Sequence, residues 1–321
     1  MKKLLALATA MIMAVSMAAC SAPAEETTTE TTEEKVYKIG VLQLVQHDAL
    51  DQSNAGFFAA LDEAGIKYEA DQQNASGDQT ACMTIAEKLV NDGSDLILAI
   101  ATPAAQAVAG VTSEIPIVLT AVTDPAESGL VADNAAPGGN VTGTSDLTPV
   151  KEQIELLTKL LPEAKTVGVL YCSAESNSGI QAEMAHEACE ANGLTAVDYT
   201  VASSNEIQTV VESMVGNVDV IYAPTDNTIA AGMTTVAMVA TDNGLPVICG
   251  ESGMVAAGGL ATYGIDYYQL GYLAGQQAIE ILVNGASPAD TPIGYLAAEQ
   301  CELTVNEETA AALGIDLSVV Q

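Results

Sequence analysis

Short apolar, β-branched runs alternate with amphipathic stretches along this chain, and the alternation occurs twice. In the first half, residues 37–42, 66–70, 96–100 and 115–119 predict strands, and residues 52–64 and 78–91 predict helices. Residues 96–100 are continuously apolar, as is typical of a parallel strand covered on both faces. Thr102 and Pro103 predict another helix start, with Thr102 as the N-cap and proline at the first helical position. This rhythm predicts an α/β fold with a doubly wound parallel sheet.

A segment rich in Gly, Pro, Asn and Asp interrupts the alternation at residues 124–147, and the alternation then restarts. Helices are predicted at 150–161, 178–192, 205–216 and 226–243, and strands at 166–172, 195–201, 218–222 and 246–248. A strand at 260–265, a helix at 267–284 capped by Asp266, and a short β-rich tail follow. The chain therefore predicts two Rossmann-like lobes with a cleft between them. We assign residues 36–146 and 267–286 to lobe 1 and residues 147–266 and 287–321 to lobe 2, joined by a multi-strand hinge.

The N-terminus predicts export. Lys2 and Lys3 precede an uncharged, mostly apolar run at residues 4–17, which is too short to cross ~30 Å of hydrocarbon. Small residues then stand directly before Cys20, so residues 1–19 are interpreted as a signal peptide and Cys20 as the lipidated residue of a lipobox. An ordinary signal peptide with a chance cysteine is the alternative. Residues 20–35 are rich in Thr and Glu and predict a disordered linker between the lipid and the lobes.

The charge and the cysteines exclude several kinds of partner. The formal net charge is −33 and the chain has no arginine, which excludes nucleic acid because binding to phosphates depends on Lys and Arg. The five cysteines after Cys20 include no C-x-x-C pair, so they predict small buried side chains rather than a zinc or redox site. They are Cys82, Cys172, Cys189, Cys249 and Cys301.

No recognised catalytic or cofactor motif occurs in the sequence. It contains no G-x-S-x-G, Walker loop, H-E-x-x-H or G-x-G-x-x-G, so we predict neither an enzyme nor a cofactor. Glu183, His186 and Glu190 share one helix face, which could hold a metal but is more typical of a solvated face. We therefore predict no metal site.

Several short motifs together resemble one protein family. They are residues 46–51 (QHDALD), 73–75 (QNA), 101–106 (ATPAAQ), 122–125 (VTDP), 137–143 (PGGNVTG), 175–178 (ESNS), 224–227 (PTDN) and 264–268 (GIDYY). In this order they resemble the substrate-binding lipoproteins of ABC importers that are related to tryptophan- and tyrosine-binding proteins. The resemblance implies a type I periplasmic-binding-protein fold, a monomer, and an aromatic amino acid as ligand. It also implies a membrane permease and a cytoplasmic ATPase as partners.

Polar residues follow the predicted strands, where open α/β sheets bind their ligands. The strand ends and the crossover also contain Asp146, Thr225, Glu251 and Ser252. The residues that we expect to contact the ligand are Gln46, His47, Asp48, Thr102, Val122, Thr123, Asp124, Ser145, Glu175, Asn177, Ser178, Asp226, Asn227 and Asp266.

An amino acid needs one site for its carboxylate and one for its ammonium group. Because the chain lacks arginine, hydroxyls and helix N-termini should hold the carboxylate, and Thr102, Thr123 and Ser178 supply them. Asp226 and Asp266 are the first candidates for the ammonium group, although each could instead cap a helix. Glu175, Asp146 and Asp124 come next.

The remaining candidates have structural alternatives. His47 could equally be a surface loop residue, and Glu175 could form the rim of the cleft. Tyr171, Tyr222 and Tyr267 could line the ligand's side chain or belong to the core. A sugar or another small solute is the rival ligand, and sensing or adhesion is the rival role.

Overall fold

The computed structural model describes residues 35–297 and 300–320. The described residues from Val36 onward form one compact unit with two parallel-sheet lobes, which confirms the predicted fold class. The signal peptide, Cys20 and most of the linker lie outside the described residues. None of the described helices is long and apolar enough to cross a membrane.

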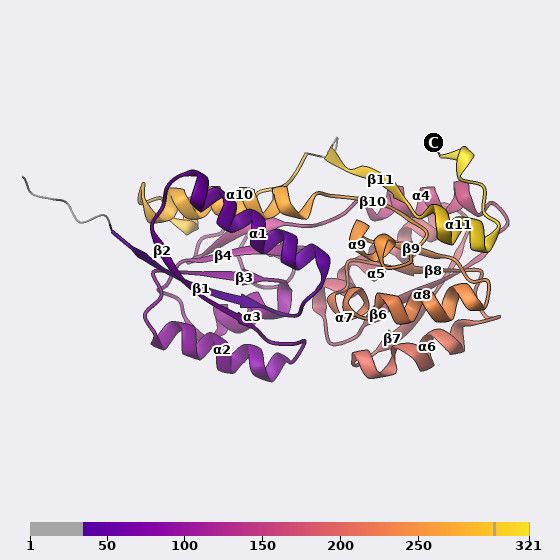
Figure 1. Ribbon diagram of the computed structural model, residues 1–321, viewed down its shortest axis with the longest axis horizontal. Helices are drawn as coiled ribbons and strands as arrows, with labels where there is room; N and C mark the ends of the chain where they lie inside the picture. The colour runs from indigo at the N-terminus through magenta and orange to yellow at the C-terminus, as the bar shows by residue number, and fades with distance from the viewer. Residues whose placement is uncertain (1–34, 298–299, 321) are drawn as a thin grey trace, which may run out of the picture. The chain divides into compact units, whose positions relative to one another are not determined.

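The first lobe contains a five-stranded parallel sheet in the order β2-β1-β3-β4-β5. Helices α1 and α10 lie on one face of this sheet and α2 and α3 on the other (Figure 1). The elements are β1 (Tyr37–Gln43), α1 (Asp48–Glu63), β2 (Tyr68–Asn74), α2 (Gln79–Asn91), β3 (Leu96–Ile100), α3 (Thr102–Val111), β4 (Ile117–Val122), β5 (Val141–Ser145) and α10 (Tyr267–Leu282).

The second lobe contains a six-stranded sheet in the order β11-β10-β9-β8-β6-β7, in which only β11 is antiparallel. Helices α4 and α5 pack on one face, and α6 and α8 pack on the other. The elements are α4 (Val150–Leu160), β6 (Thr166–Cys172), α5 (Ser176–Ala191), β7 (Thr195–Val201), α6 (Ile207–Met214), β8 (Val220–Ala223), α7 (Asn227–Ala231), α8 (Met233–Asp242), β9 (Val247–Cys249), α9 (Ser252–Ala256), β10 (Ala261–Gly264), β11 (Glu302–Val305) and α11 (Glu307–Leu313).

Glycine allows α10 to pack directly on α1. A Cβ atom at Gly56 of α1 would collide with the carbonyl oxygen of Tyr268, and a Cβ at Gly271 would collide with that of Ser53. Since neither glycine has a side chain, the two backbones approach closely. This contact brings residues from the end of the chain back to the first lobe and positions Tyr267 at the start of α10, near the crossover after β5.

The structure corrects the predicted elements in several places. Strand β5 lies inside the segment for which no strand was predicted, and its sequence VTGTS is polar although all five residues are buried. Gly143 has φ 142°, and any Cβ there would collide with Leu119 of β4, so only glycine fits. Strand β2 runs to Asn74 rather than residue 70, because this half-exposed edge strand accepts polar side chains. The helix predicted at 226–243 is two helices separated by Gly232.

Two boundaries also differ. Thr102 is the first residue of α3 rather than its N-cap, which is Ala101, a non-glycine residue with φ 81°. The first lobe extends past residue 286, because the Ala289 carbonyl accepts from the Gly138 N–H and the Ile293 N–H donates to the Asn134 carbonyl. The Ser145 N–H likewise donates to the Gly294 carbonyl. The chain thus passes between the lobes after β5, after β10 and after Gly294.

Candidate functional site

Residues from both lobes and from the crossover line one small cavity. The lining residues are His47, Leu50, Ala121, Thr123, Asp146, Asn177, Thr225, Asp226, Asn227, Ala230, Glu251 and Tyr267. The cavity lies at the carboxyl ends of the strands, as predicted from the topology.

Five predicted ligand contacts line this cavity: His47, Thr123, Asn177, Asp226 and Asn227. Nine others do not: Gln46, Asp48, Thr102, Val122, Asp124, Ser145, Glu175, Ser178 and Asp266.

Most of the nine have local partners. The Gln46 side chain reaches Asp51, Gln52 donates to Asp48, the Ser145 hydroxyl donates to the Thr123 carbonyl, and Ser178 donates to Asp226. Thr102 is buried with an unpartnered hydroxyl, and Val122 is a core residue of β4.

The two acidic residues furthest from their predicted role are Asp124 and Asp266. Asp124 accepts from the backbone N–H groups of Ala126 and Glu127 and from Asn134, so it shapes the loop after β4. Asp266 is exposed and accepts from the Gln269 N–H as the N-cap of α10. The prediction that Asp266 caps a helix is therefore confirmed, and its carboxylate does not face the cavity.

Asp226 lines the cavity, but protein groups already satisfy its carboxylate. Its Oδ1 accepts from the Ile229 N–H at 2.7 Å, and its Oδ2 accepts from the Cys172 N–H at 2.6 Å and from the Ser178 hydroxyl at 2.7 Å. Burial raises its pKa, and the nearby Glu175 carboxylate raises it further. Asp226 therefore holds the start of α7 against β6 and α5.

Glu175 lies behind the wall of the cavity. It accepts from the backbone N–H and the side-chain amide of Asn227 and from the backbone N–H and hydroxyl of Thr228, at 2.6–3.2 Å. The carboxylate is buried at 4% exposure. It therefore fixes the position and orientation of the Asn227 side chain, which does line the cavity, rather than forming the rim of the cleft.

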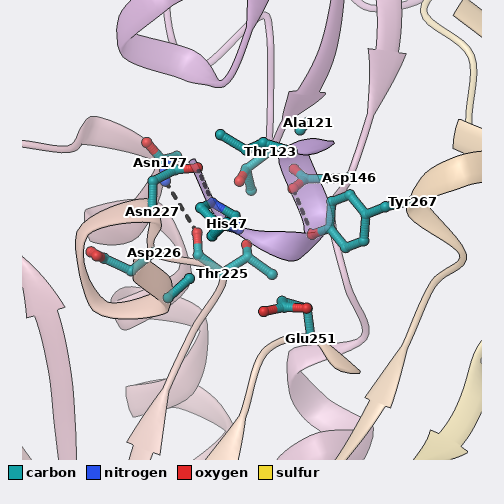
Figure 2. A pocket seen from close by; sticks show the side chains of 12 residues that line it. His47, Ala121, Thr123, Asp146, Asn177, Thr225, Asp226, Asn227, Glu251 and Tyr267 are labelled. Carbon is teal, nitrogen blue, oxygen red and sulfur yellow. Dashed lines mark hydrogen bonds between the residues drawn. The ribbon is translucent and has the colours of Figure 1, made fainter. Parts of the chain in front are cut away.

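Asp146, at the crossover after β5, has a different environment. Its Oδ2 accepts from the Tyr267 hydroxyl at 2.9 Å, and its Oδ1 is buried with no hydrogen-bond partner. Burial raises the pKa of this carboxyl to about 6, although Tyr267 and Thr123 lower it in part. The residues that line the cavity include no lysine or arginine to pair with it. Asp146 thus presents an open acceptor to the cavity (Figure 2).

Glu251 is the third carboxylate on the wall. Its oxygens accept from the Gly253 and Met254 N–H groups at the start of α9, and burial raises its pKa to about 7. Asp48 and Asp146 add like charges that raise this pKa further. The cavity therefore combines three acidic side chains with no lysine or arginine, which favours a ligand that carries a positive charge.

Sequence reasoning placed Thr225 and Glu251 at strand ends and Asp146 in the crossover, and it named Asp146 only as a later candidate for the ammonium group; none of the three was among the expected contacts. Leu50, Ala121 and Ala230 were missed altogether, since nothing distinguishes an apolar cavity residue from a core residue in the sequence. Ala121 has φ 55°, which no sequence pattern at alanine predicts. Tyr267 lines the cavity, whereas Tyr222 is fully buried in the core of the second lobe and Tyr171 packs beside that core.

Side-chain amides connect the lobes around the cavity. Gln79 donates to the Ala174 carbonyl at 2.8 Å, and Gln106 donates to the Ser176 hydroxyl oxygen at 3.3 Å. From the second lobe, Gln181 donates to the Thr123 hydroxyl oxygen at 3.2 Å. The His47 imidazole lies 3.2 Å from Asn227 Oδ1. These contacts enclose the cavity.

Other predicted features have simpler environments. All five described cysteines are free, and four are buried, as expected for small core side chains. His186 lies 2.7 Å from Asp198 on the surface. The described residues include no cluster of His, Cys, Asp and Glu that could hold a metal ion.

The sequence matches the family described as "ABC transporter substrate binding protein" over residues 38–319. It is 43% identical to the "Tyrosine-binding protein" of Clostridioides difficile (strain R20291), across 97% of this chain and 92% of the relative. A Streptococcus pneumoniae ABC domain in complex with L-Trp is 41% identical, with a TM-score of 0.85 over 88% of this chain and 96% of that one.

A third relative is similar to this chain in sequence but differs from it in conformation. The ligand-free, open structure of a Clostridium difficile substrate-binding protein with adhesive properties is 44% identical over 88% of this chain and 96% of that one, but the TM-score is only 0.66. The described structure is therefore more like the tryptophan complex than the open form, in agreement with the interlobe hydrogen bonds. This chain belongs to the family of ABC transporter substrate-binding proteins and is a binding protein rather than an enzyme.

Proposed function

We propose that this chain is the extracytoplasmic receptor of an ABC importer and binds an aromatic amino acid, tyrosine or tryptophan, in the cavity between its lobes. The observation that carries the proposal is the open oxygen of Asp146, a buried carboxylate without a counter-charge. A buried carboxylate is unfavourable unless it is paired, and a ligand ammonium group would pair with it. The similar proteins named for tyrosine and tryptophan support the aromatic class.

The remaining walls suit the other parts of such a ligand. Leu50, Ala121, Ala230 and the ring of Tyr267 supply apolar surface for an aromatic side chain. The oxygen of the Thr225 hydroxyl accepts from Gln181, so its hydrogen stays available to a ligand carboxylate. A hydroxyl rather than an arginine would thus bind the ligand carboxylate, as predicted. The hydroxyl is that of Thr225, however, and not that of Thr102 or Ser178.

Thermal unfolding in the presence of candidate solutes tests the ligand class. Tyrosine or tryptophan at a hundredfold excess over Kd should add about 2.7 kcal/mol to the free energy of unfolding. Simple sugars serve as the control, because they lack an ammonium group. A shift with a sugar and none with any aromatic amino acid would overturn the proposed ligand class.

We also propose that Cys20 anchors the protein to the outer face of the cell membrane, beside the permease and ATPase of its importer. A lipid-modified cysteine followed by a Thr- and Glu-rich linker would hold the binding unit near the permease without a spanning helix. In the Cys20→Ala variant, ligand binding should persist while the protein leaves the membrane fraction. Retention of the variant in membranes, or no fatty-acid incorporation into the wild type, would contradict the anchor.

Adhesion is a second candidate role, because one similar protein has adhesive properties. Attachment of the purified protein to a host-cell surface, compared with an unrelated protein of similar charge, tests it. This role does not require the cavity, so saturating ligand should leave such attachment unchanged.

A further inference from the structure

Three buried polar atoms on the cavity wall lack a hydrogen-bond partner within the described chain: His47 Nδ1, Asp146 Oδ1 and Asn177 Oδ1. Asp146 Oδ1 is the atom assigned above to the ligand's ammonium group. The other two atoms have no role in that assignment. A buried polar atom without a partner destabilises the protein, so each such atom in a binding cavity indicates a polar group of the ligand.

The hydrogen bonds around His47 determine that its Nδ1 is an acceptor. Asn227 Nδ2 donates to Glu175 at 2.6 Å, which fixes Oδ1 as the amide atom facing the imidazole. An amide oxygen only accepts, so His47 Nε2 carries the hydrogen in this contact. Burial lowers the pKa of His47, which keeps the ring neutral at pH 7. In a neutral ring with hydrogen on Nε2, Nδ1 has a lone pair and accepts.

Asn177 is oriented in the same way. Its Nδ2 lies 3.3 Å from the Thr225 carbonyl oxygen and 3.3 Å from the Ser178 hydroxyl oxygen. Since a carbonyl can only accept, the amide nitrogen faces Thr225 and Oδ1 is the unpartnered atom. The side chain is buried at 2% exposure. The two unassigned atoms are therefore both acceptors that require a hydrogen from the ligand.

The acceptors lie at different places on the wall. Figure 2 shows His47 and Asn177 together on one side of the cavity, near Asn227, and Asp146 with Tyr267 on the other side. An ammonium group held by Asp146 leaves the opposite side to the far end of the ligand. The phenol O–H of tyrosine and the indole N–H of tryptophan are both donors, whereas the phenylalanine ring has none.

We infer that His47 and Asn177 form a second polar subsite, which accepts a hydrogen bond from the ring substituent of the ligand and thereby selects tyrosine and tryptophan over phenylalanine. This inference rests on the proposed function, because it requires an aromatic amino acid with its ammonium group at Asp146. His47 and Asn177 would thus bind the ring substituent, while Asp146 binds the ammonium group at the other side of the cavity. Sites built to accept a ligand hydrogen reject analogues that lack it, because the buried acceptor is left unpaired.

Calorimetric titration of the wild-type protein with a matched ligand series tests this selection. Phenylalanine and 4-fluorophenylalanine, which lack the ring donor, should bind at least about tenfold more weakly than tyrosine. 4-Aminophenylalanine keeps a donor at the same ring position and should bind within a fewfold of tyrosine. This comparison needs no variant and is therefore independent of folding.

His47→Leu and Asn177→Leu then locate the subsite. Each should reduce the ratio of tyrosine to phenylalanine affinity toward one. His47 also contacts Asn227 across the lobes, but an effect on lobe closure would weaken both ligands alike and cancel in the ratio. Asp146→Asn is the matched control: it should weaken tyrosine and phenylalanine by the same factor and leave the ratio intact. Far-ultraviolet circular dichroism confirms that each variant is folded.

Equal affinity of the wild type for tyrosine, 4-fluorophenylalanine and phenylalanine would overturn the inference while leaving the proposed function standing. An unchanged ratio in both leucine variants would overturn it as well. If none of the aromatic amino acids binds, the proposed function fails, and the ring subsite fails with it.

Discussion

Asp226 in the second lobe and Asp146 at the crossover line the same cavity, yet their surroundings are opposite. Three protein donors occupy both oxygens of Asp226, and all three come from the second lobe. Asp146 receives one protein hydrogen bond, from Tyr267, and its second oxygen is open. Both carboxylates are buried, and burial raises the pKa of both. Burial therefore does not distinguish the two carboxylates. The ligand-binding carboxylate is the one with an oxygen that no protein group pairs with.

The comparison predicts a large loss of stability for Asp226→Ala. The substitution leaves the Cys172 and Ile229 N–H groups and the Ser178 hydroxyl unpaired in a buried region, at about 1–3 kcal/mol each. Partial relaxation reduces the sum, so urea unfolding should show a loss of about 3–5 kcal/mol. A loss below about 0.5 kcal/mol, which is typical of an ordinary surface site, would show that Asp226 has no structural role.

Asp146→Asn should change stability in the opposite direction. The folded-state pKa of Asp146, about 6, lies above the ordinary value of 3.8, so the folded protein binds this proton more tightly than the unfolded chain. The free energy of unfolding therefore falls as the pH rises from 4 through 6, and the ionised carboxylate continues to destabilise the ligand-free protein above pH 6. Asparagine can still accept from Tyr267 and carries no charge.

We therefore expect D146N to be about 1–3 kcal/mol more stable than the wild type at pH 8 without ligand. This gap should shrink as the pH is lowered toward 4, where the wild-type carboxyl is protonated in the folded state. Urea unfolding at several pH values measures it. A pH-independent gap would show that the effect comes from packing rather than from the charge.

The smallest effect should come from Asp266→Asn. Asp266 is exposed and caps α10, and asparagine caps about as well as aspartate. Stability should change by less than about 0.5 kcal/mol, and affinity for tyrosine by less than about twofold. A tenfold loss of affinity would indicate that Asp266 contacts the ligand, which would contradict its exposed position outside the cavity.

The sequence predicts the fold well because hydrophobic runs and helix periodicity are local signals. Strands β6 and β7 match their predicted bounds, and Asp266 is at its predicted cap. Strand β5 escaped prediction because its burial depends on the neighbouring β4 rather than on its own polar composition. Its glycine is required by a contact with a strand more than twenty residues away.

The site was predicted less completely, for a related reason. Strand-end position identifies the polar residues near the cleft, and five of the expected contacts do line the cavity. Whether a carboxylate is free to bind ligand depends on partners distant in sequence, such as Tyr267, which is 121 residues from Asp146. Asp226 and Asp266 were ranked ahead of Asp146 because they follow predicted strands, whereas Asp146 lies in the predicted crossover, and none of these positions in the sequence shows which carboxylate already has protein partners.

The most direct test of the central claim is calorimetric titration of tyrosine and tryptophan into the wild type, D146N and D266N. Removal of one partner of a buried charge pair costs about 2–5 kcal/mol, so D146N should bind both amino acids more than tenfold more weakly, while D266N binds as the wild type does. N-acetyltyrosine, which lacks the ammonium group, should bind the wild type poorly. Wild-type affinity in D146N would contradict the account and place the ammonium site elsewhere on the wall, with Glu251 as the remaining carboxylate.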